Sequence, residues 1–240
     1  MKRKYLRSMS MPTFFSAENL DINSVLQLDE ETSKHIVQVL RMKKGEEVRL
    51  TNGKGIMANS EIEDDHKKKT LVRVKNLSHF DPPARKNAIA ISLLKNASRF
   101  EWFLEKATEI GVSSIFPIIC ERTEKQHFRF DRMKNILISA MLQSQQAWLP
   151  ELSEPQQFKT IVDQPSQDEK FIAHCIELDK KELRNEIRRK SSAIILIGPE
   201  GDFTKNEIDL ALKNNFVAVS LGETRLRSET AGIVAASYLA

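Results

Sequence analysis

The last two thirds of the chain alternate between short apolar runs and longer amphipathic stretches. The apolar runs at residues 88–94, 112–119, 170–176, 193–197 and 216–221 predict buried strands. The stretches between them predict helices at 98–110, 129–147 and 178–190, one opening at Thr204, and a last one from about Ser228 to the end. Strands that alternate with helices favour an α/β fold with a mainly parallel sheet.

Local signals mark where several of these helices begin and end. Residues 98–101 (SRFE) and 204–207 (TKNE) have the spacing of a capping box. Gly111 predicts the end of the first helix, because glycine readily adopts the left-handed conformation that closes a helix.

Residues 11–80 have a different, β-rich pattern. Asp29 predicts the start of a helix that runs to about Arg41, and strands follow at 48–51, 55–62 and 70–80. Pro82 and Pro83 interrupt both helix and sheet. We therefore expect one domain at 11–80 and a second at 84–240.

Two glycine-bearing turns near the C-terminus are the strongest functional signal. They are residues 195–203 (ILIGPEGDF) and 221–231 (LGETRLRSETA), and each follows an apolar strand. Ligands of open α/β sheets bind at the carboxyl ends of the strands, where both turns would lie. Neither turn contains G-x-G-x-x-G or G-x-x-x-x-G-K-[ST], so a cradle for a pyrophosphate is not indicated.

Taken together, GPEGDF and LGETRLRSETA resemble the C-terminal signature of the SPOUT-class RNA methyltransferases. Within that class the match is to the RsmE family, which methylates N3 of a uridine in small-subunit (16S) ribosomal RNA. Further similarity lies at Lys95, at 106–112 (KATEIGV) and at 121–123 (ERT), and it covers nearly the whole chain from Met11. The resemblance implies a PUA-like β-barrel that helps hold RNA, followed by a SPOUT methyltransferase domain with a trefoil knot.

The chain departs from the family pattern at three positions. Asp202 stands where the family often has a second glycine, and Ser228 where it often has threonine. Gln146 replaces an arginine, which leaves one RNA or cofactor contact open.

The resemblance implies S-adenosylmethionine as the methyl donor. Adenine is flat and apolar with hydrogen-bonding edges, so it suits strand ends flanked by leucine, and glycine lets the backbone approach a ligand closely. The expected cofactor-binding residues are Leu196, Ile197, Gly198, Pro199, Glu200, Gly201, Leu221, Gly222 and Leu226.

Methylation of uridine N3 requires loss of a weakly acidic imide proton, so a base or a stabilising cation assists it. Arg227 is the expected cation, and Glu229 and Glu200 are candidate base or orienting carboxylates; Glu229 has an alternative role as an acid at a helix N-terminus.

RNA binding requires donors aimed at phosphates. The expected contacts are Lys95, Arg122 and Arg225, with Arg85, Lys125 and Arg129 as further candidates; Trp148 and Phe203 either stack on a base or pack.

The net charge of +4 is a weak argument for RNA binding. The leader, residues 1–10, holds four basic residues and no acid, so the remainder has 33 basic and 33 acidic residues. The leader is an upstream start, a short basic arm or a remnant of cloning. It lacks the apolar segment of a secretory signal, no apolar run approaches the ~18 residues of a membrane span, and we expect a cytoplasmic protein.

The cysteines and histidines are scattered and predict no metal site. Cys120 and Cys175 are expected to be reduced and buried, and His174 to lie in an interior strand.

Two further readings remain open: a non-catalytic RNA-binding or ribosome-assembly protein, and a SPOUT enzyme with a different RNA target. The resemblance implies a homodimer. The final helix is apolar around most of its circumference, which suits either a partner subunit or burial within its own domain.

Overall fold

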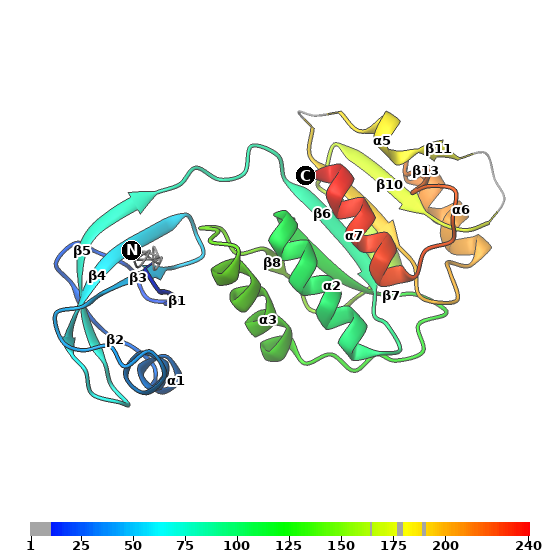
Figure 1. Cartoon of the computed structure of the whole chain (residues 1–240). Coiled ribbons are helices and arrows are strands. Elements are labelled where there is room, and N and C mark those ends of the chain that lie inside the picture. The colour runs from blue at the N-terminus through cyan, green and yellow to red at the C-terminus, as the bar shows by residue number, and fades with distance from the viewer. Residues whose placement is uncertain (1–10, 164, 177–179, 189–190) are drawn as a thin grey trace, which may run out of the picture. The chain divides into compact units, whose positions relative to one another are not determined.

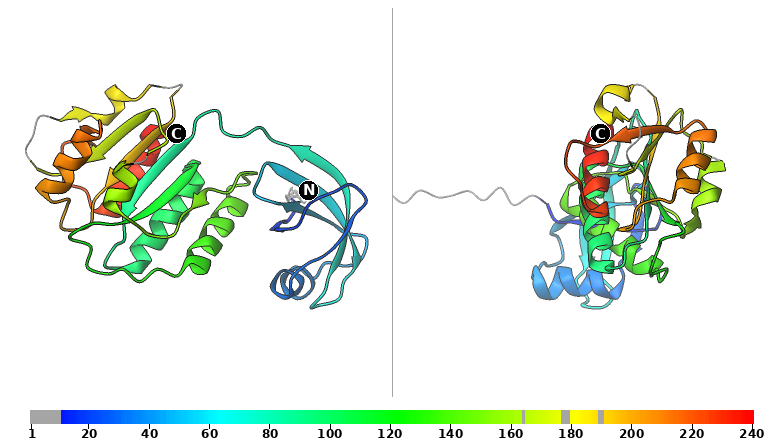
Figure 2. Two further views of the ribbon diagram at one scale, coloured as in Figure 1. Left: turned by 180° about the vertical axis from the view of Figure 1, so that it is seen from behind. Right: turned by 90° about the vertical axis from the view of Figure 1, so that its right-hand side faces the viewer.

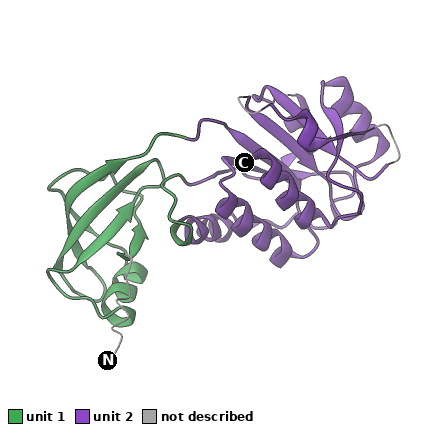
Figure 3. Cartoon of the chain, turned by 45° about the horizontal axis from the view of Figure 1, so that its top comes forward, with its two compact units in different colours: residues 1–82, 142–148 green, residues 83–141, 149–240 purple. Residues whose placement is uncertain are grey.

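The computed structural model describes residues 11–163, 165–176, 180–188 and 191–240, and these divide into two compact units. One unit runs to Pro82 and includes Leu142–Trp148, and the other comprises Pro83–Met141 and Leu149–Ala240 (Figure 3). No helix of the described residues is long and apolar enough to cross a membrane.

The first unit is a curved five-stranded sheet with one helical segment (Figure 1). Its strand order is β1-β3-β4-β5-β2, in which β1 is parallel to β3 and the other pairs are antiparallel. The strands are β1 (Thr13–Phe15), β2 (Val25–Gln27), β3 (Glu47–Thr51), β4 (Ile56–Asp64) and β5 (Leu71–His79). The three predicted strands are confirmed, whereas β1 and β2 were missed because three residues are too few to show a period of two.

The helical segment of this unit begins where the sequence predicts. The side chain of Asp29 accepts a hydrogen bond from the backbone N–H of Thr32 at 2.8 Å, which caps α1 (Glu30–Lys34). The chain then continues as one turn of π-helix, His35–Val39, so the predicted extension to Arg41 is wrong by two residues.

Trp148 packs within the first unit. Its indole N–H donates to the backbone oxygen of Phe80 at 3.2 Å, and its ring lies so close to Gly55 that a Cβ there would overlap it. These contacts favour the packing role of Trp148 over base stacking.

The second unit is built on a parallel sheet with the order β11-β13-β10-β12-β6-β7-β8, and β9 also pairs with β7 (Figure 1). Its strands are β6 (Asn87–Ser92), β7 (Ser114–Ile119), β8 (Glu151–Leu152), β9 (Gln156–Gln157), β10 (Glu169–Ala173), β11 (Lys181–Glu182), β12 (Ala193–Ile197) and β13 (Val217–Ser220). The predicted mainly parallel sheet is therefore confirmed. The trefoil knot stays a prediction, because strand order does not trace how a loop passes around the chain.

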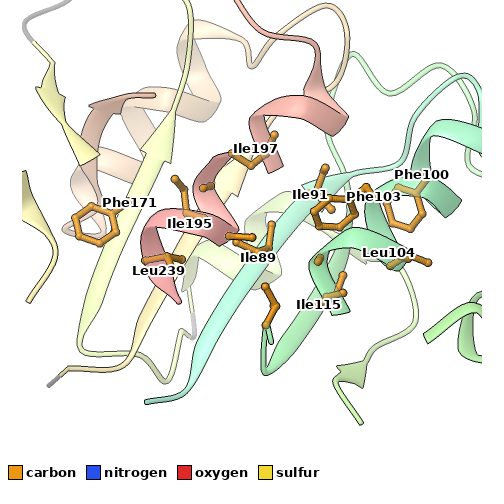
Figure 4. Packing of buried hydrophobic residues seen from close by; sticks show 14 of the residues in the cluster. Ile89, Ile91, Phe100, Phe103, Leu104, Ile115, Phe171, Ile195, Ile197 and Leu239 are labelled. Carbon is orange, nitrogen blue, oxygen red and sulfur yellow. The ribbon is translucent and has the colours of Figure 1, made fainter. Parts of the chain in front are cut away.

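Helices cover both faces of this sheet (Figure 2). The side chains of Ile89 and Ile91 lie in the core beneath α2 (Ala97–Ile110), α3 (Phe130–Gln143) and α7 (Ser228–Leu239), as Figure 4 shows for the residues it labels. The alternate residues Ala88 and Ala90 lie in the opposite core, beneath α4 (Phe158–Asp163) and α6 (Lys205–Lys213). Burial of both faces explains the continuous apolar runs seen in the sequence.

Two of the predicted helix limits are confirmed, whereas the helix predicted over 129–147 ends at Gln143. Gly111 closes α2 with a φ of +94°, and the capping box of Thr204 and Glu207 opens α6. The predicted capping box at Ser98 is wrong, because Asn96 caps α2 by accepting a hydrogen bond from the Ser98 N–H.

The predicted helix at 178–190 is also wrong within the described residues. The chain forms the edge strand β11 and only one helical turn, α5 (Leu183–Glu186). Pairing of Lys181 and Glu182 with β13 outweighs the helical preference of this charged segment, and residues 177–179 and 189–190 lie outside the described part.

Candidate functional site

A cavity of about 580 Å³ lies where β10, β12 and β13 end. These three strands are neighbours and parallel, so their carboxyl ends meet at one edge of the sheet. The lining comes from the last residues of these strands, from the three loops that follow them and from the start of α7. It consists of Ala173, His174, Cys175, Lys180, Ile197, Gly198, Pro199, Glu200, Asp202, Val219, Ser220, Leu221, Gly222, Glu223, Thr224, Arg225, Leu226, Arg227, Ser228 and Ala231.

Most of the residues expected to bind the cofactor line this cavity. They are Ile197, Gly198, Pro199, Glu200, Leu221, Gly222 and Leu226. Leu196 does not, because its fully buried side chain faces the core under α4 and α6. Gly201 lies beside the cavity instead, where a Cβ would meet the side chain of Arg122 at 3.4 Å.

Gly198 and Gly222, one in each glycine-bearing loop, have different structural roles. Gly222 has a φ of +135°, and a Cβ built on it would meet no protein atom within 4 Å. A Cβ on Gly198 would lie 3.2 Å from the ring of Phe203, so this glycine is needed mainly for packing of its own loop. The expectation that both glycines make room for a ligand therefore holds geometrically only for Gly222.

Phe203 is a core residue and not a stacking platform. Its side chain is fully buried, and its ring packs against that of Phe158 with 5.3 Å between centroids. The possibility that Phe203 stacks on a base is thus wrong, because no face of the ring is accessible.

Asp202, which stands where the family often has glycine, adopts the left-handed conformation with a φ of +62°. Aspartate tolerates this region better than most residues do. Its carboxylate accepts hydrogen bonds from the backbone N–H of Cys175 at 2.7 Å and of Phe203 at 2.8 Å. The substitution therefore links the loop after β12 to the loop after β10.

Glu200 and Lys95 are brought together although they lie far apart in the sequence. The Oε1 atom of Glu200 accepts a hydrogen bond from the backbone N–H of Lys95 at 3.1 Å. The Lys95 ammonium lies 2.8 Å from the carboxylate of Glu124, and this contact raises the pKa of Lys95. Lys95 is therefore a permanently charged, exposed group beside the loop after β12.

Arg122 lies beside the same loop. Its Nη1 atom donates a hydrogen bond to the backbone oxygen of Gly201 at 2.7 Å, and the residue is exposed. Lys95 and Arg122 thus flank the loop after β12, and Arg225 lies in the loop after β13.

Arg227 is the N-cap residue of α7 and Glu229 lies in its first turn, but the two side chains face different surroundings. Arg227 is exposed, lines the cavity, and has no hydrogen-bond partner for its guanidinium among the described residues. Glu229 is only 7% exposed and does not line the cavity. Its Oε1 atom lies 3.6 Å from Nε of Arg99, and within the described part of the chain Oε2 has no partner.

Sequence reasoning missed the loop after β10, which contributes His174, Cys175 and Lys180 to the cavity. His174 was placed in an interior strand, but β10 ends at Ala173. In the sheet, β10 lies between β12 and β13, so the loop after β10 lies next to both glycine-bearing loops. The sequence does not show this strand order and therefore could not reveal the contribution of this loop.

The cysteine predictions are half correct. Both thiols are free, and burial raises the pKa of Cys120, which suits an inert core residue. Cys175 is exposed, so the prediction that it is buried is wrong. No cluster of residues suited to a metal ion occurs in the described ranges.

Gln146, at the position of the family arginine, lies in the segment that belongs to the first unit. Its side-chain amide donates to the hydroxyl of Ser144 at 3.0 Å.

Comparison with known proteins agrees with this architecture. The family model described as RNA methyltransferase domain matches residues 82–240, and the one described as RNA methyltransferase PUA domain matches residues 28–75. The ribosomal RNA small subunit methyltransferase E of Rickettsia conorii is 30% identical over 89% of this chain and 88% of its own length. The chain belongs to the family of ribosomal RNA small subunit methyltransferase E. The expectation of a PUA-like domain joined to a SPOUT-type methyltransferase domain is thereby confirmed.

Solved structures of this family are similar over nearly the whole chain. A probable rRNA methyltransferase from Porphyromonas gingivalis is 35% identical, with a TM-score of 0.88 over 95% of this chain and 96% of that one. The methyltransferase E from Neisseria gonorrhoeae, solved with bound S-adenosylmethionine, is 29% identical, with a TM-score of 0.85 over the same shares.

Proposed function

We propose that this protein transfers the methyl group of S-adenosylmethionine to N3 of a uridine in small-subunit (16S) ribosomal RNA. The observation that carries the proposal is the cavity at the ends of β10, β12 and β13, which combines an apolar wall with exposed arginines. Membership of the methyltransferase E family and the donor-bound structure from Neisseria gonorrhoeae support it. This substrate implies that the protein works in the cytoplasm.

The cavity has properties that suit the donor. Its volume of about 580 Å³ falls in the ordinary range for cofactor sites. Leu221 and Leu226 offer an apolar surface for adenine, and the open space beside Gly222 allows a ligand to approach the backbone closely. Ile197, Pro199 and Glu200 complete the proposed donor contacts. When bound, the donor supplies an electrophilic methyl group on a sulfonium.

Arg227 is the proposed stabilising cation. Removal of the N3 proton leaves negative charge that spreads over the two neighbouring uracil carbonyl oxygens. A guanidinium directed at that charge lowers the barrier, because it favours the anionic ring over the neutral one. Arg227 suits this role because it lines the cavity and its guanidinium is not engaged by another described residue.

The two glutamates receive different roles. Glu200 lines the cavity, and its Oε1 atom is held by the Lys95 N–H, which leaves Oε2 as the proposed acceptor of the N3 proton. Glu229 is buried against Arg99 away from the cavity lining, so we assign it the orientation of the first turn of α7, which directly follows Arg227.

RNA binding is assigned to Lys95, Arg122 and Arg225, with the PUA-like domain as a further contact surface. The three side chains are exposed and lie in loops at the carboxyl edge of the sheet, where they can neutralise phosphates. The proposed substrate is the RNA itself or the assembled small subunit.

We also propose a homodimer formed through α7. One side of this helix packs Ala235, Ala236 and Leu239 into its own core, whereas Val234 stays half-buried and Tyr238 is 39% exposed. A second copy of the chain would cover this apolar side. Light scattering at micromolar concentration is expected to give twice the 27.5 kDa of one chain, and the mass of a single chain would refute the dimer.

The decisive experiment maps 3-methyluridine in small-subunit RNA after incubation with S-adenosylmethionine and the protein. We expect one uridine to be methylated at N3, and about 10- to 1000-fold slower methylation of the same uridine with Arg227→Ala. A protein that binds RNA but neither binds the donor nor forms product would be a non-catalytic assembly factor. Methylation of a ribose or of transfer RNA would indicate a SPOUT enzyme with a different target.

A further inference from the structure

The loop after β10 places a buried histidine in the wall of the cavity. His174 is only 6% exposed, and neither of its ring nitrogens has a hydrogen-bond partner among the described residues. Buried polar atoms are nearly always paired in native proteins, because an unpaired one loses its interaction with water without compensation. A side chain of this kind in a ligand cavity indicates that the ligand supplies the missing partner.

The surroundings of His174 keep its ring neutral. Burial, and next the positive charge of Lys180, lower the pKa of His174, while the carboxylate of Asp202 and a weak contact with the backbone of Ile176 oppose this effect. The Lys180 ammonium is held in place by donating to the backbone oxygen of His174 at 2.9 Å. A neutral imidazole presents one N–H donor and one acceptor nitrogen.

We propose that His174 binds one ribose hydroxyl of the methyl donor and thereby positions the donor in the cavity. This assignment rests on the proposed function. A hydroxyl group both donates and accepts, so a ribose hydroxyl can pair with the N–H or with the acceptor nitrogen of a neutral imidazole.

The other parts of the donor match this wall less well. The sulfonium and the amino group are cationic and would be repelled by the nearby Lys180. Asp202 does not offset that repulsion fully, because its electrostatic effect at His174 is weaker than that of Lys180. The methionine carboxylate only accepts hydrogen bonds, and it would suit the Lys180 ammonium better than an imidazole.

The test couples a change in the protein to a change in the ligand. The ligands are S-adenosylhomocysteine, its 2′-deoxy and 3′-deoxy analogues, and methylthioadenosine, which lacks the amino-acid end. Calorimetry measures the affinity of each ligand for the wild type, for His174→Phe and for His174→Asn. His127→Phe, an exposed histidine of the same unit outside the cavity lining, is the matched control.

We expect His174→Phe to weaken S-adenosylhomocysteine and methylthioadenosine about tenfold, which corresponds to loss of roughly one hydrogen bond. The same substitution should have little effect on at least one deoxy analogue, because the partner hydroxyl is already missing. His174→Asn, which retains a donor and an acceptor, should lose less affinity for these ligands than His174→Phe does. His127→Phe should bind them as tightly as the wild type. If His174→Phe does not unfold cooperatively, the comparison between the ligands is made with His174→Asn.

The outcomes separate this inference from the proposed function. Equal binding of S-adenosylhomocysteine by the wild type and both His174 variants would overturn the role of His174 and leave the function intact. A loss that is the same for all ribose analogues, or that disappears with methylthioadenosine, would also overturn it. Failure of the wild type to bind S-adenosylhomocysteine would refute the proposed function itself.

Discussion

Replacing Gly222 with alanine tests whether the cavity holds the methyl donor. Gly222 lines the cavity, and an added Cβ would meet no protein atom within 4 Å. The new methyl group therefore does not disturb the packing of the protein. It projects into space that, on our proposal, the donor needs.

Two separate costs follow from the structure. A φ of +135° is unfavourable for alanine, and such backbone strain costs about 1–3 kcal/mol of stability. For a chain of this size each kcal/mol lowers Tm by about 2–4 °C. Overlap of a methyl group with a tightly packed ligand costs about 1–3 kcal/mol more, which weakens donor binding by roughly 5- to 150-fold.

Gly111→Ala is the matched control for the strain. Gly111 has a φ of +94°, a Cβ there also meets no atom within 4 Å, and it lies outside the lining of the cavity. Both variants should unfold cooperatively at reduced Tm, but only Gly222→Ala should lose affinity for S-adenosylmethionine in calorimetry. If Gly222→Ala binds the donor as tightly as Gly111→Ala does, the donor does not lie against Gly222 and our placement is refuted.

Three further predictions concern catalysis, pH and packing. Arg227→Ala should reduce methyl transfer by about 10- to 1000-fold in single-turnover assays with little change in donor affinity, and near-normal turnover with saturating RNA would contradict its role. Because the pKa of buried His174 is lowered from 6.5, its protonation favours the unfolded state, so this residue should make Tm fall as the pH drops below that value. His174→Phe should reduce that acid-induced fall, and an unchanged pH profile of Tm would argue against it. Gly232→Ala should lower Tm even though alanine favours a helix by about 1 kcal/mol over glycine, because its Cβ would lie 2.6 Å from the ring of Phe103; a raised Tm would show that α2 and α7 can separate without cost.

Helix ends could be predicted well wherever the signal was local. Gly111 and the Thr204–Glu207 pair behave as predicted, because capping involves groups within a few residues of one another. The cap of α2 was predicted at Ser98, two residues too late, because Asn96 provides a side-chain oxygen that caps the helix instead. Residues 181–182 form a strand only because β13 offers an edge, which no local pattern reports.

The candidate site could be predicted only in part, for the same reason. The loops after β12 and β13 are visible as glycine-bearing turns that follow apolar strands, and most of their named residues line the cavity. The direction of each side chain is not visible, so Leu196 was assigned to the cofactor although it faces the core, and the packing of Phe203 could not be separated from base stacking. His174 was overlooked because its loop contains no motif.

The sequence by itself determined the alternation of strands and helices, the parallel sheet and the two glycine loops, since these depend on periodicity and on contacts between near neighbours in the chain. Tertiary structure decided that β10 lies between β12 and β13, which brings His174 to the cavity, and that Lys95 meets Glu200 from 105 positions away. Strand order and long-range contacts follow from how the two faces of the sheet are buried together, and a local pattern carries no information about that choice.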